Sequence, residues 1–254
     1  MNETTPKFRS LGMAVMGLMA LLPASPAMTT ENIPVVPSCQ LYTGDASIEA
    51  LQKHSILLKE QLLHSVSSGD HCQLANIHYK LAQLLPDKQV QHLDSCIDHS
   101  RSAITRDSHA GVAYFFKGLC LGRLGETRGI WGSLKIIEPI RESMEIAARI
   151  NPAIDRGGPH RALGRLYFKL PMILGGNIKK SIDHLLKALV YGPMYWENHF
   201  FLAESYFKNQ QYLLARTELQ RAMEITSHMK ADPENPTRKV EFQGLMQAIE
   251  RNIH

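Results

Sequence analysis

Residues 196–222 read WENHFFLAESYFKNQQYLLARTELQRA, and their spacing decides the fold. Counted from Trp196 as position one, large residues stand at seven and eleven and small ones at eight, twenty and twenty-seven: Leu202, Tyr206, Ala203, Ala215 and Ala222. Small residues at these intervals let two helices approach closely, and the large residues fill the gap between them. The stretch therefore predicts two antiparallel helices whose remaining apolar face must be covered by another helix pair.

The preceding stretch shows the same spacing with a longer turn. Counted from Gly157, the residues at seven, eight and eleven are Leu163, Gly164 and Tyr167. Residues 169–177 then lengthen the turn, after which small residues return and a proline follows where a repeat ends: Ser181, Ala188 and Pro193. A second unit in the same register predicts a series of helix pairs.

Earlier residues continue the series in a more divergent form. Gly118 and Leu121 take positions eight and eleven, residues 125–138 form a long insertion, and Ala147 and Pro152 close the unit. The earliest pair, at about residues 76–103, is the most degenerate. Such a series is typical of tetratricopeptide repeats, and sustained strand alternation is missing from the sequence. We predict an all-α fold over residues 46–254, a tetratricopeptide-like helix-pair solenoid of antiparallel helix hairpins in a right-handed stack.

The N-terminus predicts export. Lys7 and Arg9 precede an apolar run at residues 11–22, and small residues lead to a cleavage position after Ala27. We therefore expect a signal peptide at residues 1–27 and a flexible linker at 28–45, with an uncleaved membrane anchor or a buried helix as alternatives. After cleavage the protein would be periplasmic or otherwise exported, and a lipid anchor on Cys39 is disfavoured by its distance from the apolar run.

Composition excludes some classes of function. The formal net charge is +4 and lysines and arginines are not clustered, so nucleic-acid binding is not expected. Cys39, Cys72, Cys96 and Cys120 would be free to form disulfides in an oxidising compartment. Four cysteines allow three complete pairings, and the sequence does not choose among them.

One segment resembles a known family. Residues 157–171 (GGPHRALGRLYFKLP), followed by 174–177 (LGGN) and 180–188 (KSIDHLLKA), are similar to the TatT family of tetratricopeptide components associated with TRAP transporters. Residues 118–152 also resemble the regulator-of-microtubule-dynamics repeat proteins. The TatT resemblance implies a periplasmic helical scaffold that associates with a transporter's solute-binding subunit, sometimes as an oligomer.

The first helix of each pair is expected to line a concave groove, at positions two, five, nine, twelve and thirteen. Over the three units these positions supply basic, aromatic and acidic side chains: Arg123, Arg161, Arg165, Lys169, Lys208, Phe115, Phe168, Phe200, Phe207 and Glu204. Guanidinium groups bind carboxylates or phosphates, and aromatic walls bury apolar groups. The set predicts a groove for an anionic, partly apolar ligand. The alternative is that the arginines form a salt-bridged face and the phenylalanines are core.

The sequence gives little evidence of a catalytic site or a metal site. His92, Cys96 and His99 share one helix face and His78 lies on the preceding helix, but such groupings are usually half-buried residues. The sequence contains neither a nucleophile elbow nor a P-loop. We therefore expect a protein that is not an enzyme and holds no metal or cofactor.

Two hypotheses of function remain. In the first, the protein is a scaffold for a partner protein, such as a transporter solute-binding subunit. In the second, it carries a small anionic or hydrophobic ligand in an enclosed channel lined by Phe115, Phe168 and Phe200. Apolar residues in the insertion, including Trp131 and Ile137, would plug the groove, cover an end of the stack or form a subunit contact.

Overall fold

A computed structural model describes residues 39–64, 67–228 and 236–253, and these residues are all helical or irregular, with no strand among them. The helices are α1 (Ile48–His64), α2 (Ser68–Leu84), α3 (Gln89–Arg106), α4 (Gly111–Ser133), α5 (Ile137–Ile150), α6 (Gly158–Lys169), α7 (Ile178–Tyr191), α8 (Trp196–Lys208), α9 (Tyr212–Ser227) and α10 (Pro236–Ile253). Short 3-10 turns stand at Pro86–Lys88, Leu134–Ile136 and Met172–Leu174. The all-α prediction is confirmed.

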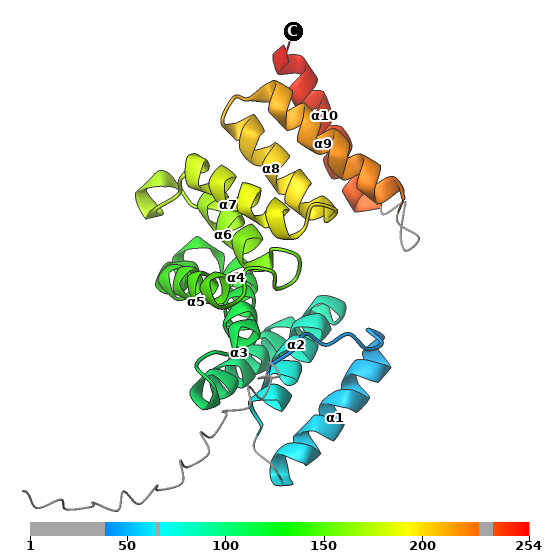
Figure 1. Cartoon of the computed structure of the whole chain (residues 1–254), viewed down its shortest axis with the longest axis vertical. Helices are drawn as coiled ribbons and strands as arrows, with labels where there is room; N and C mark the ends of the chain where they lie inside the picture. Colours follow the sequence, from blue (N-terminus) through cyan, green and yellow to red (C-terminus); the bar gives the residue numbers. More distant parts are fainter. Residues whose placement is uncertain (1–38, 65–66, 229–235, 254) are drawn as a thin grey trace, which may run out of the picture. The chain divides into compact units, whose positions relative to one another are not determined.

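The helices pack as consecutive pairs. The pairs are α2 with α3, α4 with α5, α6 with α7, and α8 with α9, and each pair also contacts the next (Figure 1). The first helices of successive pairs touch one another as well, which brings α2, α4, α6 and α8 to a common side. Helix α1 packs on α2 and α10 packs on α9, so each terminal pair has a covering helix, as a stack of repeats requires.

One alanine recurs at the close approach of each pair. Ala103, Ala147, Ala188 and Ala222 occupy the same place in the second helix of the four pairs, and each is completely buried. At three of them the carbonyl accepts a hydrogen bond from a residue four positions on, which ends the helix: Asp107, Asn151 and Gly192. A larger side chain here would force the two helices apart, so the alanines fix the interhelical distance.

The structure differs from the sequence prediction at the insertion. Residues 125–138 were expected to be an insertion between helices, but α4 continues through Ser133 and is the longest described helix, with 23 residues. The stretch contains glycines but no proline, and glycine weakens a helix without breaking it. The side chains of residues 128–133, including Trp131, lie outside the described part of the chain.

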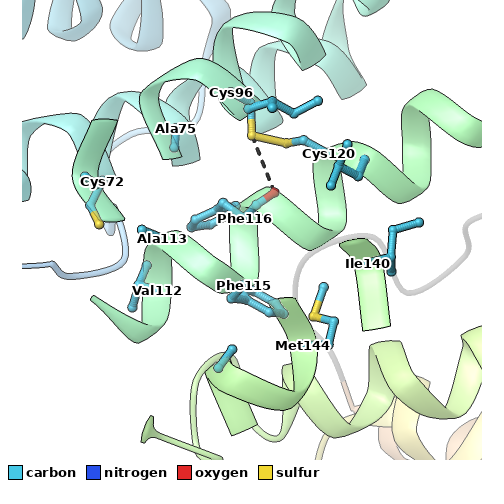
Figure 2. Close-up of a cluster of buried hydrophobic side chains, with 14 of the residues drawn as sticks. Cys72, Ala75, Cys96, Val112, Ala113, Phe115, Phe116, Cys120, Ile140 and Met144 are labelled. Atoms are coloured by element: carbon cyan, nitrogen blue, oxygen red, sulfur yellow. Dashed lines mark hydrogen bonds between the residues drawn. A yellow bond between two sulfur atoms is a disulfide. The ribbon is translucent and has the colours of Figure 1, made fainter. Parts of the chain in front are cut away.

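The main hydrophobic core lies between α2, α3, α4 and α5 (Figure 2). Phe115 and Phe116 of α4 are buried there with Met144 of α5. Gly118 allows this packing because a Cβ at that position would lie 2.7 Å from the Met144 methyl carbon. The disulfide between Cys96 and Cys120 joins α3 to α4 within the same core.

Residues 39–45, which we call the N-terminal strap, are anchored to the helical body. Cys39 is buried and forms a disulfide with Cys72 of α2. The backbone N–H of Tyr42 donates to Asn76 Oδ1 at 2.8 Å. The sequence suggested a flexible linker over 28–45; within it, the disulfide and this hydrogen bond attach the strap to α2. The predicted signal peptide and residues 28–38 lie outside the described residues. None of the described helices is both long enough and apolar enough to span a bilayer.

Candidate functional site

A cleft of about 1130 Å³ lies along the first helices of the pairs. Its walls come from α2, α4, α6 and the start of α8, with α5 and the N-terminal strap closing its sides. Arg123, Arg156 and Lys169 line it and are exposed, so the cleft opens to solvent. A cleft of this volume can hold a drug-sized molecule or a short peptide segment.

The apolar part of the cleft lies on α4 and α5. Leu119 of α4 and Ile137 and Ile140 of α5 line it, and α4 also contributes the glycines at positions 118, 122 and 125 to the lining. Among the described residues, no atom outside the neighbouring backbone of α4 lies within 4 Å of a Cβ placed at Gly122. At Gly122, α4 therefore presents its backbone to open space in the cleft.

Five of the ten predicted groove residues line this cleft: Phe115, Arg123, Arg161, Arg165 and Lys169. Phe200 and Glu204 line a smaller neighbouring hollow of about 530 Å³, formed by α6, α8 and α10. Phe168, Phe207 and Lys208 line neither hollow. Of the three phenylalanines expected around an enclosed channel, only Phe115 borders the cleft, and it is almost fully buried beneath Gly158.

Arg161 is the most buried cation of the cleft, with 8% of its surface exposed. It forms ion pairs with Asp155 and with Glu197, the latter at 3.5 Å, and donates to Asn198 Oδ1 at 3.2 Å. Its guanidinium lies 4.4 Å from the ring centroid of Tyr195. Burial, and next the negative charge of Glu197, raises the pKa of Tyr195, so this tyrosine stays neutral beside the ion pairs.

Arg165 is held in a similar way one turn further on. It forms an ion pair with Glu204 of α8 and lies between the rings of Phe201 and Phe168, 4.1 Å and 5.0 Å from their centroids. Burial raises the pKa of the Glu204 carboxyl, against the opposing charge of Arg165. The planar guanidinium therefore bridges α6 and α8 by both charge and stacking.

A third group of charges crosses the mouth of the cleft between α4 and α6. Glu126 accepts from Arg123 at 3.0 Å and also pairs with Lys169. Burial alone would raise the pKa of the Glu126 carboxyl, but the hydrogen bond and charge of Lys169 hold it below its ordinary value. The carboxylate is thus ionised at neutral pH and joins the two helices.

Two cations of the cleft are stacked on aromatic rings and have no carboxylate partner among the described residues. Lys80 Nζ lies 5.8 Å from the ring centroid of Tyr42, and the Arg156 guanidinium lies 4.8 Å from that of Tyr195. The cleft is lined by more cations than carboxylates: Lys80, Arg123, Arg156, Arg161, Arg165 and Lys169 against Glu126, Asp155 and Glu197. The surplus charge favours an anionic occupant.

The turn before α6 places two of these charged groups. Asp155, Arg156 and Gly157 all have positive φ, at 46°, 54° and 86°. Consecutive left-handed residues other than glycine are unfavourable, and they persist where surrounding contacts hold them. Here the Asn198 side chain, which is completely buried, donates to the carbonyl of Arg156 at 3.1 Å. The turn thereby points Asp155 at Arg161 and lays Arg156 over Tyr195.

The histidine and cysteine grouping considered from the sequence takes a different form. Cys96 is bonded to Cys120 and so has no free thiolate to offer a metal. His78 contacts His92, while His99 contacts His71, at ring-nitrogen distances of 3.0 Å in each case. Within the described ranges, no set of three or more histidine, cysteine, aspartate or glutamate side chains is arranged to hold a metal ion.

Similarity to known proteins is found only at the level of structure. Neither a protein-family model nor a curated protein matches the sequence. Among solved structures, the chain is similar to the crystal structure of MamA protein, with 15% sequence identity and a TM-score of 0.44. That match covers 71% of this chain and 88% of the other.

Proposed function

We propose that this protein is an exported tetratricopeptide-like scaffold that binds an anionic segment of a partner protein in the cleft along α2, α4, α6 and α8. The open cleft of about 1130 Å³, with its excess of cationic side chains, is the observation that carries the proposal. Stacked helix pairs expose extended concave surfaces of this kind, which serve protein recognition.

Export is supported by the cysteines. All four pair in the structure, as Cys39 with Cys72 and Cys96 with Cys120. Structural disulfides persist in the periplasm and outside the cell and are rare in a reducing cytosol. The signal peptide expected at residues 1–27 agrees with this. Because the sequence resembles the TatT family, we propose a transporter solute-binding subunit as the partner.

The charge arrangement supports recognition of an acidic segment. Within the described ranges, the Lys80 and Arg156 side chains contact aromatic rings and form no ion pair, so a carboxylate can approach either of them without displacing one. Arg161 and Arg165 are already neutralised by carboxylates, so they hold the cleft in shape and are not free to bind a ligand. Arg156 is therefore the cleft arginine that we assign to ligand binding, whereas Arg161 and Arg165 have a structural role.

A small-ligand carrier is the second candidate, and the apolar face of the cleft is the observation that favours it. Leu119, Ile137 and Ile140 form a wall next to open space above Gly122. An acyl or aromatic group would bury its surface there. The cleft is open to solvent, which is less favourable for retaining a free hydrophobic molecule.

One experiment separates the two candidates. Mature protein (residue 28 onward) is used as bait in an extract of the cell envelope, and the bound proteins are identified by mass spectrometry. Native mass spectrometry of the same preparation detects a bound small molecule. Recovery of one solute-binding protein in stoichiometric amount supports the scaffold. A bait that recovers no protein but carries a small molecule of fixed mass would contradict it and support the carrier.

A further inference from the structure

Three of the four helix pairs place a histidine at the same point of their interface. His71 of α2, His160 of α6 and His199 of α8 each face a residue four positions before the buried alanine of the second helix. That residue is His99 in α3, His184 in α7 and Glu218 in α9. Equivalent positions of the repeat thus hold two histidine–histidine contacts and one histidine–carboxylate contact.

The pair α2/α3 carries a second such contact, which gives a cluster of four histidines. We call His71, His78, His92 and His99 the histidine cluster. Nδ1 of His71 lies 3.0 Å from Nδ1 of His99, and Nδ1 of His78 lies 3.0 Å from Nδ1 of His92. The rings of His78 and His99 also stack, with centroids 5.6 Å apart. The two contacts are therefore parts of one group.

The contacts and the burial of the cluster favour uncharged imidazole rings. Two ring nitrogens at 3.0 Å can share a hydrogen bond when one carries a proton and the other a lone pair. When both rings are imidazolium ions, two N–H groups and two positive charges face each other. His78 is only 5% exposed, and Nε2 of His78 and of His92 are buried and have no hydrogen-bond partner in the part of the chain that the structure describes. A positive charge on these two rings would therefore be poorly stabilised by solvent or by hydrogen bonds.

The surrounding charges reinforce this preference. Lys59 from α1, Lys88 before α3 and Arg106 at the end of α3 act against a positive charge on the cluster, while Asp70 and Asp98 favour one. Burial is the largest effect: it lowers the pKa of His78 to about 3 and that of His99 to about 4, and it also lowers those of His71 and His92.

We propose that the histidine cluster is an acid-sensitive contact between α2 and α3, which separates these two helices when the environment becomes acidic. A histidine exposed by separation regains its ordinary proton affinity, so protons bind the separated form more tightly than the packed form. The packed form is complete above about pH 6.5, the ordinary histidine pKa, and is lost progressively as the pH falls below it.

The two disulfides determine which elements would move. Cys96–Cys120 keeps α3 on α4, and Cys39–Cys72 keeps the N-terminal strap on α2. Helix α2 and the strap would therefore move together, away from α3 and α4. Tyr42, Tyr79 and Lys80 are on these moving elements and line the cleft. Acid would widen the cleft on this side, a consequence that does not depend on which ligand or partner the cleft binds.

The other pairs provide internal comparisons. In α8/α9, Nδ1 of His199 lies 2.7 Å from Glu218 Oε2, so this pair brings a histidine against a carboxylate and not against a second imidazole. In α6/α7, His160 and His184 approach within 3.2 Å, with Lys187 acting against a proton and Asp183 favouring one. Acid sensitivity should be greatest in α2/α3, smaller in α6/α7 and smallest in α8/α9.

Hydrogen–deuterium exchange measures the relative acid sensitivity of the three helix pairs. Exchange is followed by mass spectrometry at about pH 7.5 and about pH 5, with a chelator present and rates corrected for intrinsic exchange. We expect protection in α2 to fall at least about tenfold more than in α8/α9. The double variant His92→Gln/His99→Gln keeps neutral hydrogen-bonding groups and should reduce this difference. His109→Gln, at an exposed site, should leave it unchanged.

Equal changes of protection in α2 and α9 in the native protein would overturn the proposal. If the double variant is not folded at neutral pH, NMR titration of the histidine rings in the native protein supplies the test. The cluster should then titrate together with the loss of α2 protection. Rings that become protonated while α2 stays fully protected would also contradict the proposal.

Discussion

At Arg161, a single side chain connects the cleft to the stability of the fold. It pairs with Asp155 and Glu197, donates to Asn198 and stacks on Tyr195. Arg161→Ala would leave two carboxylates facing each other in a half-buried site, and we expect it to lower the free energy of unfolding by about 2–3 kcal/mol. Urea denaturation measures the loss.

Arg101→Ala is the matched control for this prediction. Arg101 pairs with Asp98 on the exposed face of α3, at 3.5 Å. Exposed pairs contribute little, so this variant should change the free energy of unfolding by less than about 0.5 kcal/mol. If the two variants lose equal free energy of unfolding, the Arg161 contacts stabilise the protein no more than an exposed ion pair does.

Two glycines should respond to alanine in opposite directions. Gly157 has a φ of 86°, and a Cβ there would lie 2.5 Å from the Ala188 carbonyl oxygen. Gly122 lies inside α4 with open space at its Cβ. Gly157→Ala should therefore destabilise the protein by more than about 1 kcal/mol, and Gly122→Ala should stabilise it by up to about 1 kcal/mol. Thermal melting distinguishes the signs, and a stabilising Gly157→Ala would refute the account of this turn.

At the scale of single elements, the N-terminal strap depends on its disulfide. Cys39 and Cys72 are separated by 33 residues, a loop for which chain entropy gives about 3–4 kcal/mol of stabilisation. The double variant Cys39→Ala/Cys72→Ala should lose stability of this order and release Leu41 and Tyr42 from the cleft. Denaturation gives the first effect and exchange of residues 40–43 the second. Unchanged protection of the strap would show that the Tyr42–Asn76 hydrogen bond is sufficient.

Spacing in the sequence predicted most elements of the later repeats. The small residues of α6 to α9 identified both pairs, because close helix approach tolerates only a few side chains at those positions. The extension of α4 through Ser133 was not predictable in this way, since glycines signal a turn yet are tolerated inside a helix that is packed on its neighbours. The disulfide pairing was also open, because it depends on which helices become neighbours.

For the cleft, sequence position located the cations but not their partners. Arg123, Arg161, Arg165 and Lys169 were expected from repeat positions and do line it. Asp155 and Tyr195 were missed because they lie in turns, where repeat periodicity gives no signal. The run Asp155-Arg156-Gly157 before a proline-containing helix start was the available hint, since aspartate and glycine favour turns.

At the scale of the whole molecule, acid should reduce stability. His71, His78, His92, His99, His160 and His184 all have pKa values lowered chiefly by burial. A histidine with a lowered folded pKa takes up its proton on unfolding, so its stabilising effect is complete above about pH 6.5 and declines below it. Each contributes a slope of at most about 1.4 kcal/mol per pH unit.

Denaturation midpoints between about pH 7.5 and pH 5 measure this dependence. A decrease steeper than one histidine can produce would show that several titrate on unfolding. A variant with His78→Phe should flatten the curve, provided that it folds, whereas His228→Gln at an exposed site should leave it unaltered. A stability that stays constant over this range would contradict the burial of the histidines.

The central claim is that a partner binds in the cleft over α4, and blocking the cleft tests it most directly. Gly122→Phe would place a ring in the cleft from a position with room for a Cβ. Gly122→Ala leaves the cleft nearly empty, and Gly244→Phe adds the same bulk on α10, where a Cβ also has room. Affinity for the captured partner is then measured for all three. The account predicts that Gly122→Phe alone weakens binding, by at least about tenfold. Undiminished binding by a correctly folded Gly122→Phe protein would contradict it.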